Sequence, residues 1–206
     1  MKDVHIENDG LNLYGQYFDF GYHRAVIIIP GRCESLMYSY FFSEPFEKAG
    51  FNVLVIDIRA HGMSDGKYDH VGVGEHRDVI KWGELLHDSF ENEELWIMGI
   101  CMGANTAILS LIEPDCPDYF KALVSEGMYI SFKENFKQHM NYDHHPTFPI
   151  VNMVMALVKK HTGTDVDTIC PIDRIDRVQV PVLFIAGKND FYSKAECTKM
   201  LLETEK

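Results

Sequence analysis

The stretch LWIMGICMGANTAILSLI, residues 95–112, decides the fold of this chain. Its first six residues form a compact run rich in Leu and Ile, which is typical of a strand buried on both faces. The residues from 101 to 112 follow without a linker and have helical character up to Pro114. We therefore predict a buried strand that passes directly into a helix.

Four further apolar runs share this character, and helical stretches lie between them. The runs are AVIII (25–29), VLVIDI (53–58), ALVSEG (122–127) and VPVLFIAG (180–187). The predicted helices cover 38–49, 75–90 and the residues after 193, where Ser193-Lys194-Ala195-Glu196 has the pattern of a capping box. Residues 4–18 contain a DG turn signal and predict an entering hairpin. This alternation predicts an α/β fold, a mostly parallel sheet with helices on both faces.

One segment breaks the alternation, because about fifty residues separate the strand at 122–127 from the next strand. We predict an inserted helical cap over residues 128–176, within a single domain of residues 1–206. Part of the cap, IVNMVMALV at 150–158, is apolar and rich in methionine. It either lines a pocket for an apolar substrate or packs on the body beneath.

Composition excludes several classes of protein. The 206 residues are 46% hydrophobic, and 19 Lys and Arg against 31 Asp and Glu give a net charge of −12, the wrong sign for binding nucleic acid. No apolar run approaches the length of about 20 residues that a membrane span needs, and the polar start is unlike a signal peptide, so we expect a cytoplasmic protein. Five cysteines without a C-x-x-C pair predict neither a disulfide framework nor a zinc site. The oligomeric state is not fixed by the sequence.

The pentapeptide Gly99-Ile100-Cys101-Met102-Gly103 matches the spacing G-x-S-x-G, with cysteine in place of serine. A turn that presents the central side chain outward leaves no room for Cβ atoms two residues to either side. A helix N-terminus behind the thiol is expected to lower its pKa. The alternative is that Cys101 is a small buried residue and that the glycines only tighten a strand–helix turn.

The order of motifs resembles the α/β-hydrolase superfamily, and most of all its branch of serine aminopeptidase-like, monoglyceride lipase-like and carboxylesterase enzymes. The matching segments cover nearly the whole chain. They are IIIPGRCES, VIDIRAHGMSDG, GICMGA, DVDTICPIDRI and VPVLFIAGKNDFYS, in the order of the family.

The resemblance implies specific roles for four residues. Cys101 takes the nucleophile position and Asp190 that of the triad acid, for which Glu126 is the less favoured alternative. The backbone N–H groups of Arg32 and Met102 match the two donors to the oxyanion. Pro30 departs from the family, which usually has histidine there, as Cys101 departs from serine. The resemblance implies no cofactor and no metal.

The histidine base of such a relay is missing from its expected place after the acid, because all ten histidines precede Asp190. We therefore expect the chain to stop short of the last strand, histidine loop and helix of the family. His61, in RAHGMSDG, and the cap histidines 139, 144 and 145 are weaker candidates for the base. Asp143-His144-His145 also invites a metal interpretation, although no third ligand is fixed by spacing.

The leading prediction is an enzyme that hydrolyses a small or apolar acyl ester, a small-molecule substrate, through residue 101 and an oxyanion hole. Cysteine at this position also resembles dienelactone hydrolases, without their other motifs. It could equally be an engineered replacement of serine or part of a degenerate site. Two other functions stay open: a non-catalytic ligand-binding protein, and a redox sensor that pairs Cys33 with Cys101.

Overall fold

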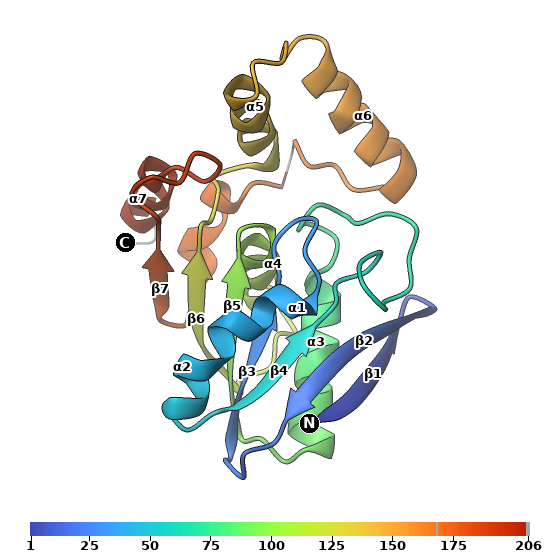
Figure 1. Cartoon of the computed structure of the whole chain (residues 1–206), viewed down its shortest axis with the longest axis vertical. Coiled ribbons are helices and arrows are strands. Elements are labelled where there is room, and N and C mark those ends of the chain that lie inside the picture. The colour runs from blue at the N-terminus through green and yellow to red at the C-terminus, as the bar shows by residue number, and fades with distance from the viewer. Residues whose placement is uncertain (168, 205–206) are drawn as a thin grey trace.

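A computed structural model describes residues 1–167 and 169–204, and its centre is a seven-stranded sheet (Figure 1). The strand order is β1-β2-β4-β3-β5-β6-β7. The five strands β4, β3, β5, β6 and β7 are parallel to one another. The strands are β1 (Lys2–Asn8), β2 (Leu11–Phe18), β3 (Arg24–Ile29), β4 (Asn52–Ile56), β5 (Glu94–Ile100), β6 (Phe120–Glu126) and β7 (Val182–Ile185). The predicted mostly parallel α/β sheet is confirmed.

The predicted hairpin is the antiparallel pair β1 and β2, in which Asn8 faces Leu11. Both residues of the turn, Asp9 and Gly10, have positive φ angles of 53° and 73°. This backbone is the type that matches the twist of a two-residue hairpin. The hairpin joins the sheet through antiparallel pairing of β2 with β4.

Side chains of the inner strands alternate between two cores, one on each face of the sheet. Ile27 and Ile29 belong to the core beneath α3 (His76–Glu84) and α4 (Met102–Leu111). Val26 and Ile28 belong to the core beneath α1 (Leu36–Ser39) and α2 (Ser43–Lys48). All four side chains are fully buried. Helices therefore cover both faces, as predicted and as Figure 1 shows.

The predicted helix over 38–49 is wrong in one respect, because the structure divides it. It forms α1 (Leu36–Ser39), a 3-10 turn η1 (Tyr40–Phe42) and α2 (Ser43–Lys48). Pro45 explains the division: it has no N–H to donate to a preceding turn and is tolerated only near the start of a helix. The helix predicted over 75–90 is α3 followed by a π-helical turn, η2 (Leu85–Ser89).

Between β6 and β7 the chain forms α5 (Phe132–Tyr142), α6 (Ile150–Thr162) and the 3-10 turns η3 (Pro171–Asp173) and η4 (Ile175–Arg177). Helices α5 and α6 lie beyond the ends of β5, β6 and β7 to which the arrows point (Figure 1). The chain then returns through β7 to α7 (Ala195–Thr204). The described part of the 128–176 segment thus contains two helices and two 3-10 turns, while its standing as a separate insertion stays a prediction. Within the described residues, no helix has the length and apolar character to cross a membrane.

Candidate active site

Cys101 is the single residue between β5 and α4, and its backbone is strained. Its φ and ψ angles are 50° and −108°, in a region that residues with a side chain seldom occupy. Such a conformation costs about 1–3 kcal/mol and persists only where the surroundings enforce it. The Cys101 N–H donates a 2.7 Å hydrogen bond to the carbonyl of Glu126 on β6, which fixes the turn to the neighbouring strand.

The glycines on either side of Cys101 are required by close backbone approach, as predicted. A Cβ atom on Gly99 would lie 2.4 Å from the Cα of Ala104, and one on Gly103 would lie 2.4 Å from the carbonyl oxygen of Ile29. Neither neighbour can rotate away, because both are backbone atoms. The two glycines of the G-x-C-x-G pattern are therefore explained by close packing of α4 against the sheet.

The prediction about the thiol pKa is wrong. Burial raises the pKa of Cys101, and this effect outweighs the opposing contacts from the Ser193 hydroxyl, the Met102 backbone N–H and the Arg32 charge. The Cys101 Sγ lies 3.9 Å from the Ser193 Oγ. The thiol, not the thiolate, is the resting form at neutral pH.

A cavity of about 350 Å³ opens beside Cys101 and brings together residues from five parts of the chain. Its wall includes Arg32, Glu34, Cys101, Glu126, His139 and Asp190. Three of the four predicted site residues thus meet at one place. The fourth, Met102, is buried beside the cavity, and its N–H approaches the thiol as the first amide of α4.

Asp190 lies in a tight turn between β7 and α7. Its Oδ1 accepts hydrogen bonds from the backbone N–H groups of Tyr192 (2.8 Å) and Ser193 (2.9 Å). The predicted capping box at Ser193 does not form: α7 begins at Ala195, and the Ser193 hydroxyl faces Cys101 instead. The Asp190 carboxylate therefore shapes the turn that places Ser193 against the thiol.

Carboxylates gather around this cavity. Burial raises the pKa of Glu126, and the negative charges of Asp190 and Glu34 raise it further. Glu34 Oε2 accepts a 2.7 Å hydrogen bond from the Gly31 N–H and so closes the loop that follows β3. Arg32 belongs to the same loop, and its guanidinium is the one cationic side chain in the described wall.

His139, on α5, is the only histidine that lines this cavity among the described residues. Its Nδ1 lies 2.8 Å from Nη2 of Arg32. His144 and His145 are exposed. Among described residues, no group of three side chains is placed to hold a metal ion.

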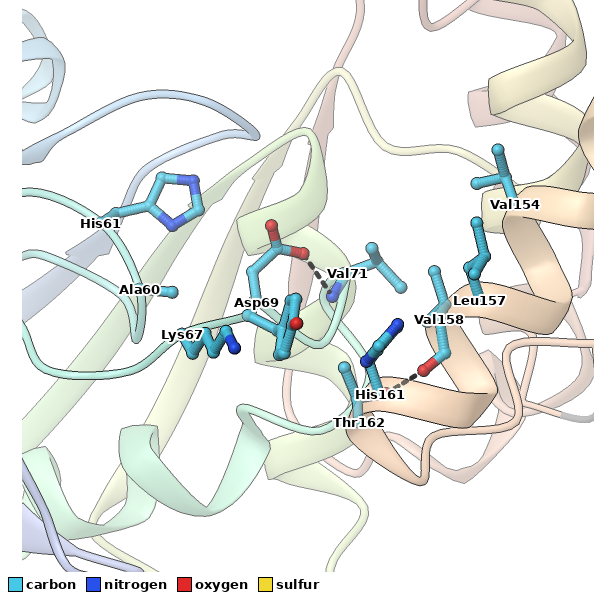
Figure 2. Close-up of a pocket in the computed structure, with 11 residues that line it drawn as sticks. Ala60, His61, Lys67, Asp69, Val71, Val154, Leu157, Val158, His161 and Thr162 are labelled. Atoms are coloured by element: carbon cyan, nitrogen blue, oxygen red, sulfur yellow. Dashed lines mark hydrogen bonds between the residues drawn. The ribbon is translucent and has the colours of Figure 1, made fainter.

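His61 lies elsewhere. It lines a second cavity of about 530 Å³ between the loop after β4 and helix α6 (Figure 2). The methionine-rich segment supplies Val154, Leu157 and Val158 to this second cavity, while Val151 and Met155 are buried against the body. Neither His61 nor the methionine-rich segment belongs to the described wall around Cys101.

The sequence analysis did not predict that Ser193 and Glu34 line the cavity beside Cys101, and it ranked His139 only among the weaker candidates for the base. Ser193 carried one usable signal, since it follows Asp190 by three residues in the same turn. Cys33, the predicted redox partner, is an exposed free thiol outside the described wall of the cavity. Its position adds no support to a pairing with Cys101.

Comparison with known proteins assigns the class. A sequence model described as alpha/beta hydrolase fold matches residues 24–154. The chain belongs to the α/β-hydrolase fold family.

Similarity to individual proteins extends over most of the chain. The Pyrococcus furiosus esterase Pf2001 superposes with a TM-score of 0.78 and 27% identity, over 99% of this chain and 77% of the esterase. A lipase-esterase related protein of Clostridium acetobutylicum shares the fold, with a TM-score of 0.70 and 14% identity over 93% of this chain and 86% of its own. YqkD of Bacillus subtilis, an uncharacterized protein, is 29% identical over 90% of this chain. This chain spans 64% of the length of YqkD.

Proposed function

We propose that the chain carries the nucleophile, oxyanion and acid parts of an ester hydrolase for small acyl groups. One observation carries the proposal: a strained strand–helix turn holds Cys101 in the same cavity as Arg32 and Asp190. Strained backbone at a cavity is typical of reactive positions, where the surroundings hold a geometry that the chain would otherwise leave. The 27% identity to the esterase Pf2001 supports this class of reaction.

In the proposed reaction, the Cys101 sulfur attacks the ester carbonyl carbon and its proton passes to a base. The carbonyl oxygen becomes an alkoxide that accepts hydrogen bonds from the N–H groups of Arg32 and Met102, each contributing about 3 kcal/mol in comparable sites. Collapse of the tetrahedral intermediate breaks the bond to the alcohol, which leaves with a proton. Water then attacks the thioester and releases the carboxylic acid.

The cavity favours a small acyl group. Its volume of about 350 Å³ is near the lower end for small-molecule sites, and much of its wall is charged. The apolar segment at 150–158, which predicted an apolar substrate, contributes to the other cavity. A short acyl ester therefore fits better than a long-chain ester.

His139 is unsuited to be the base. Arginine only donates hydrogen bonds, so Nδ1 of His139 must accept, and the proton of the neutral ring is then on Nε2. Such a ring has no free lone pair with which to take the Cys101 proton. The described wall of the cavity therefore contains no histidine suited to be the base.

Acylation of the thiol tests the proposal directly. The chain is mixed with p-nitrophenyl acetate, and nitrophenol release and intact mass are followed for the parent, Cys101→Ala and Cys33→Ala. We expect a burst and the mass of one acetyl group in the parent and in Cys33→Ala, and neither in Cys101→Ala. Identical traces from all three would refute acylation at residue 101 and favour a ligand-binding protein with this fold.

A further inference from the structure

One face of α5 contacts the turn that holds Asp190. Asn135, His139 and Tyr142 are spaced by four and three residues and share this face. Asn135 is buried and its Nδ2 donates a 2.8 Å hydrogen bond to the carbonyl of Tyr192. The rings of His139 and Tyr142 lie 4.5 Å and 5.6 Å from the ring of Tyr192.

The same face of α5 also reaches the loop after β3, through His139 alone. The 2.8 Å contact between Arg32 Nη2 and His139 Nδ1 joins residues that are 107 positions apart in the chain. No other side-chain hydrogen bond of the described residues connects α5 to that loop. His139 is therefore the point at which one helix holds both the Arg32 loop and the Asp190 turn.

The contact requires a neutral histidine. Protonation would place a hydrogen on Nδ1, remove the acceptor and set a second positive charge against the guanidinium. The proton of the neutral ring lies on Nε2, which is buried without a hydrogen-bond partner among the described residues. Among the described residues the ring thus makes one hydrogen bond, to Arg32, and that bond requires the neutral ring.

We propose that His139 is a positioning residue whose neutral ring fastens α5 to Arg32 and whose protonation releases the Arg32 loop. Because Arg32 is the proposed oxyanion donor, the part of this inference that concerns catalysis rests on the proposed function. The part that concerns the attachment of α5 does not.

The groups around the ring favour the neutral form. Burial lowers the pKa of His139 and the Arg32 charge lowers it further, against smaller opposing effects of Asp143 at the end of α5 and Asp190 in the turn. Tyr192, from the same turn, faces the His139 ring with its aromatic side chain. A histidine whose pKa is lowered in the folded chain stabilises the structure above its ordinary pKa of about 6.5, and this stabilisation is lost as the pH falls through the lower value.

Hydrogen exchange of residues 132–142 and of the loop at 30–35 tests the proposal in the whole chain. Measurements at pH 8 and pH 5 are corrected for the intrinsic pH dependence of exchange and compared between the parent, His139→Phe and His139→Asn. Phe keeps an aromatic ring beside Tyr192 but has no acceptor, whereas the Asn side-chain oxygen can occupy the place of Nδ1 and does not titrate.

We expect about tenfold faster exchange in both segments for the parent at pH 5 and for His139→Phe at both pH values. His139→Asn should exchange like the parent at pH 8 and keep that rate at pH 5. Arg32→Met should lose the difference between the two pH values, since the partner of the titrating ring is gone.

A parent chain whose two segments exchange equally at both pH values would overturn the inference. So would a His139→Asn variant that behaves like His139→Phe, because the acceptor would then be irrelevant. Acylation by p-nitrophenyl acetate is recorded in parallel. If the exchange pattern holds while acylation at Cys101 is absent, the proposed function fails and the attachment of α5 stands.

Discussion

The loop after β4 and helix α5 are held in place differently. The loop after β4 is fixed by buried charges: the Arg59 guanidinium makes two hydrogen bonds to Asp78, at 2.8 Å and 2.6 Å, and both side chains are about 5% exposed. Helix α5, in contrast, contacts the 190–193 turn and the Arg32 loop through one buried amide, one histidine and partly exposed rings. Ionic contacts in the interior fail all at once when one partner is lost, whereas neutral contacts at a surface can open and close. The loop after β4 is thus a rigid floor of the second cavity, whereas α5 is an adjustable cover of the cavity beside Cys101.

Breaking the ion pair of the floor should give the largest effect. Arg59→Met leaves the Asp78 carboxylate buried with only Asn8 as a side-chain partner, and we expect a loss of about 3–5 kcal/mol in the free energy of unfolding. Urea denaturation measures it. Lys48→Met, which removes the fully exposed pair with Glu44, is the control and should leave the midpoint unchanged. Equal midpoints for the two variants would contradict the contrast between floor and surface.

Crowding at the Cys101 turn should come next. Gly103→Ala forces a Cβ atom against the backbone at the end of β3. We expect the free energy of unfolding to fall by about 2–3 kcal/mol, as at other overpacked sites. Gly187→Ala is the matched control, because a Cβ atom there would meet its nearest neighbour at 3.4 Å, an ordinary contact. Thermal unfolding of both variants compares them. A Gly103→Ala chain as stable as the control would show that α4 can move away from the sheet.

A buried carboxyl of the floor should make stability depend on pH. Burial raises the pKa of Glu75 to about 7, above its ordinary value of 4.5. Its contribution is therefore complete below pH 4.5 and is lost as the pH rises through 7, a decline of about 2–3 kcal/mol between pH 5 and pH 8. Glu75→Gln should remove this decline when unfolding is measured from pH 5 to pH 8. The exposed Glu7→Gln should retain the decline, and a decline that persists in Glu75→Gln would assign it to another group.

The cover should show the smallest effect. Asn135→Ala removes the amide that donates a hydrogen bond to the carbonyl of Tyr192. We expect the free energy of local opening of α5 to fall by about 1 kcal/mol. The loss should be confined to exchange in residues 132–142 and 190–193, with strands β3 and β5 unaffected. Faster exchange throughout the sheet would show that the cover and the floor unfold as one unit.

Local patterns predicted the parts of the site that are local. The strand–helix turn at Cys101 follows from two glycines and an apolar run, and the hairpin follows from Asp9-Gly10, because each depends on neighbouring residues. The parallel order of the inner strands follows from alternation of strands and helices. Pro45 was visible in the sequence, yet the predicted helix ran through it, since the effect of a proline depends on which turn it occupies.

Contacts between residues far apart in the chain could not be predicted from the sequence. Nothing near Arg32 indicates that His139 will meet it, since the contact depends on where α5 comes to lie over the sheet. The sign of the thiol pKa shift was predicted wrongly because burial outweighs the other effects on Cys101, and burial depends on packing that neighbouring residues do not reveal. The resemblance to a family placed Asp190 near Cys101, where spacing alone could not.

The carboxylates in the cavity wall bear on what happens after hydrolysis. A neutral ester can approach Cys101 without electrostatic penalty, but its acid product is an anion that faces Glu34, Glu126 and Asp190 with Arg32 as the one compensating charge. In the proposed reaction, the cavity therefore accepts the neutral ester substrate but repels the carboxylate product. The negative charge of the product favours its release.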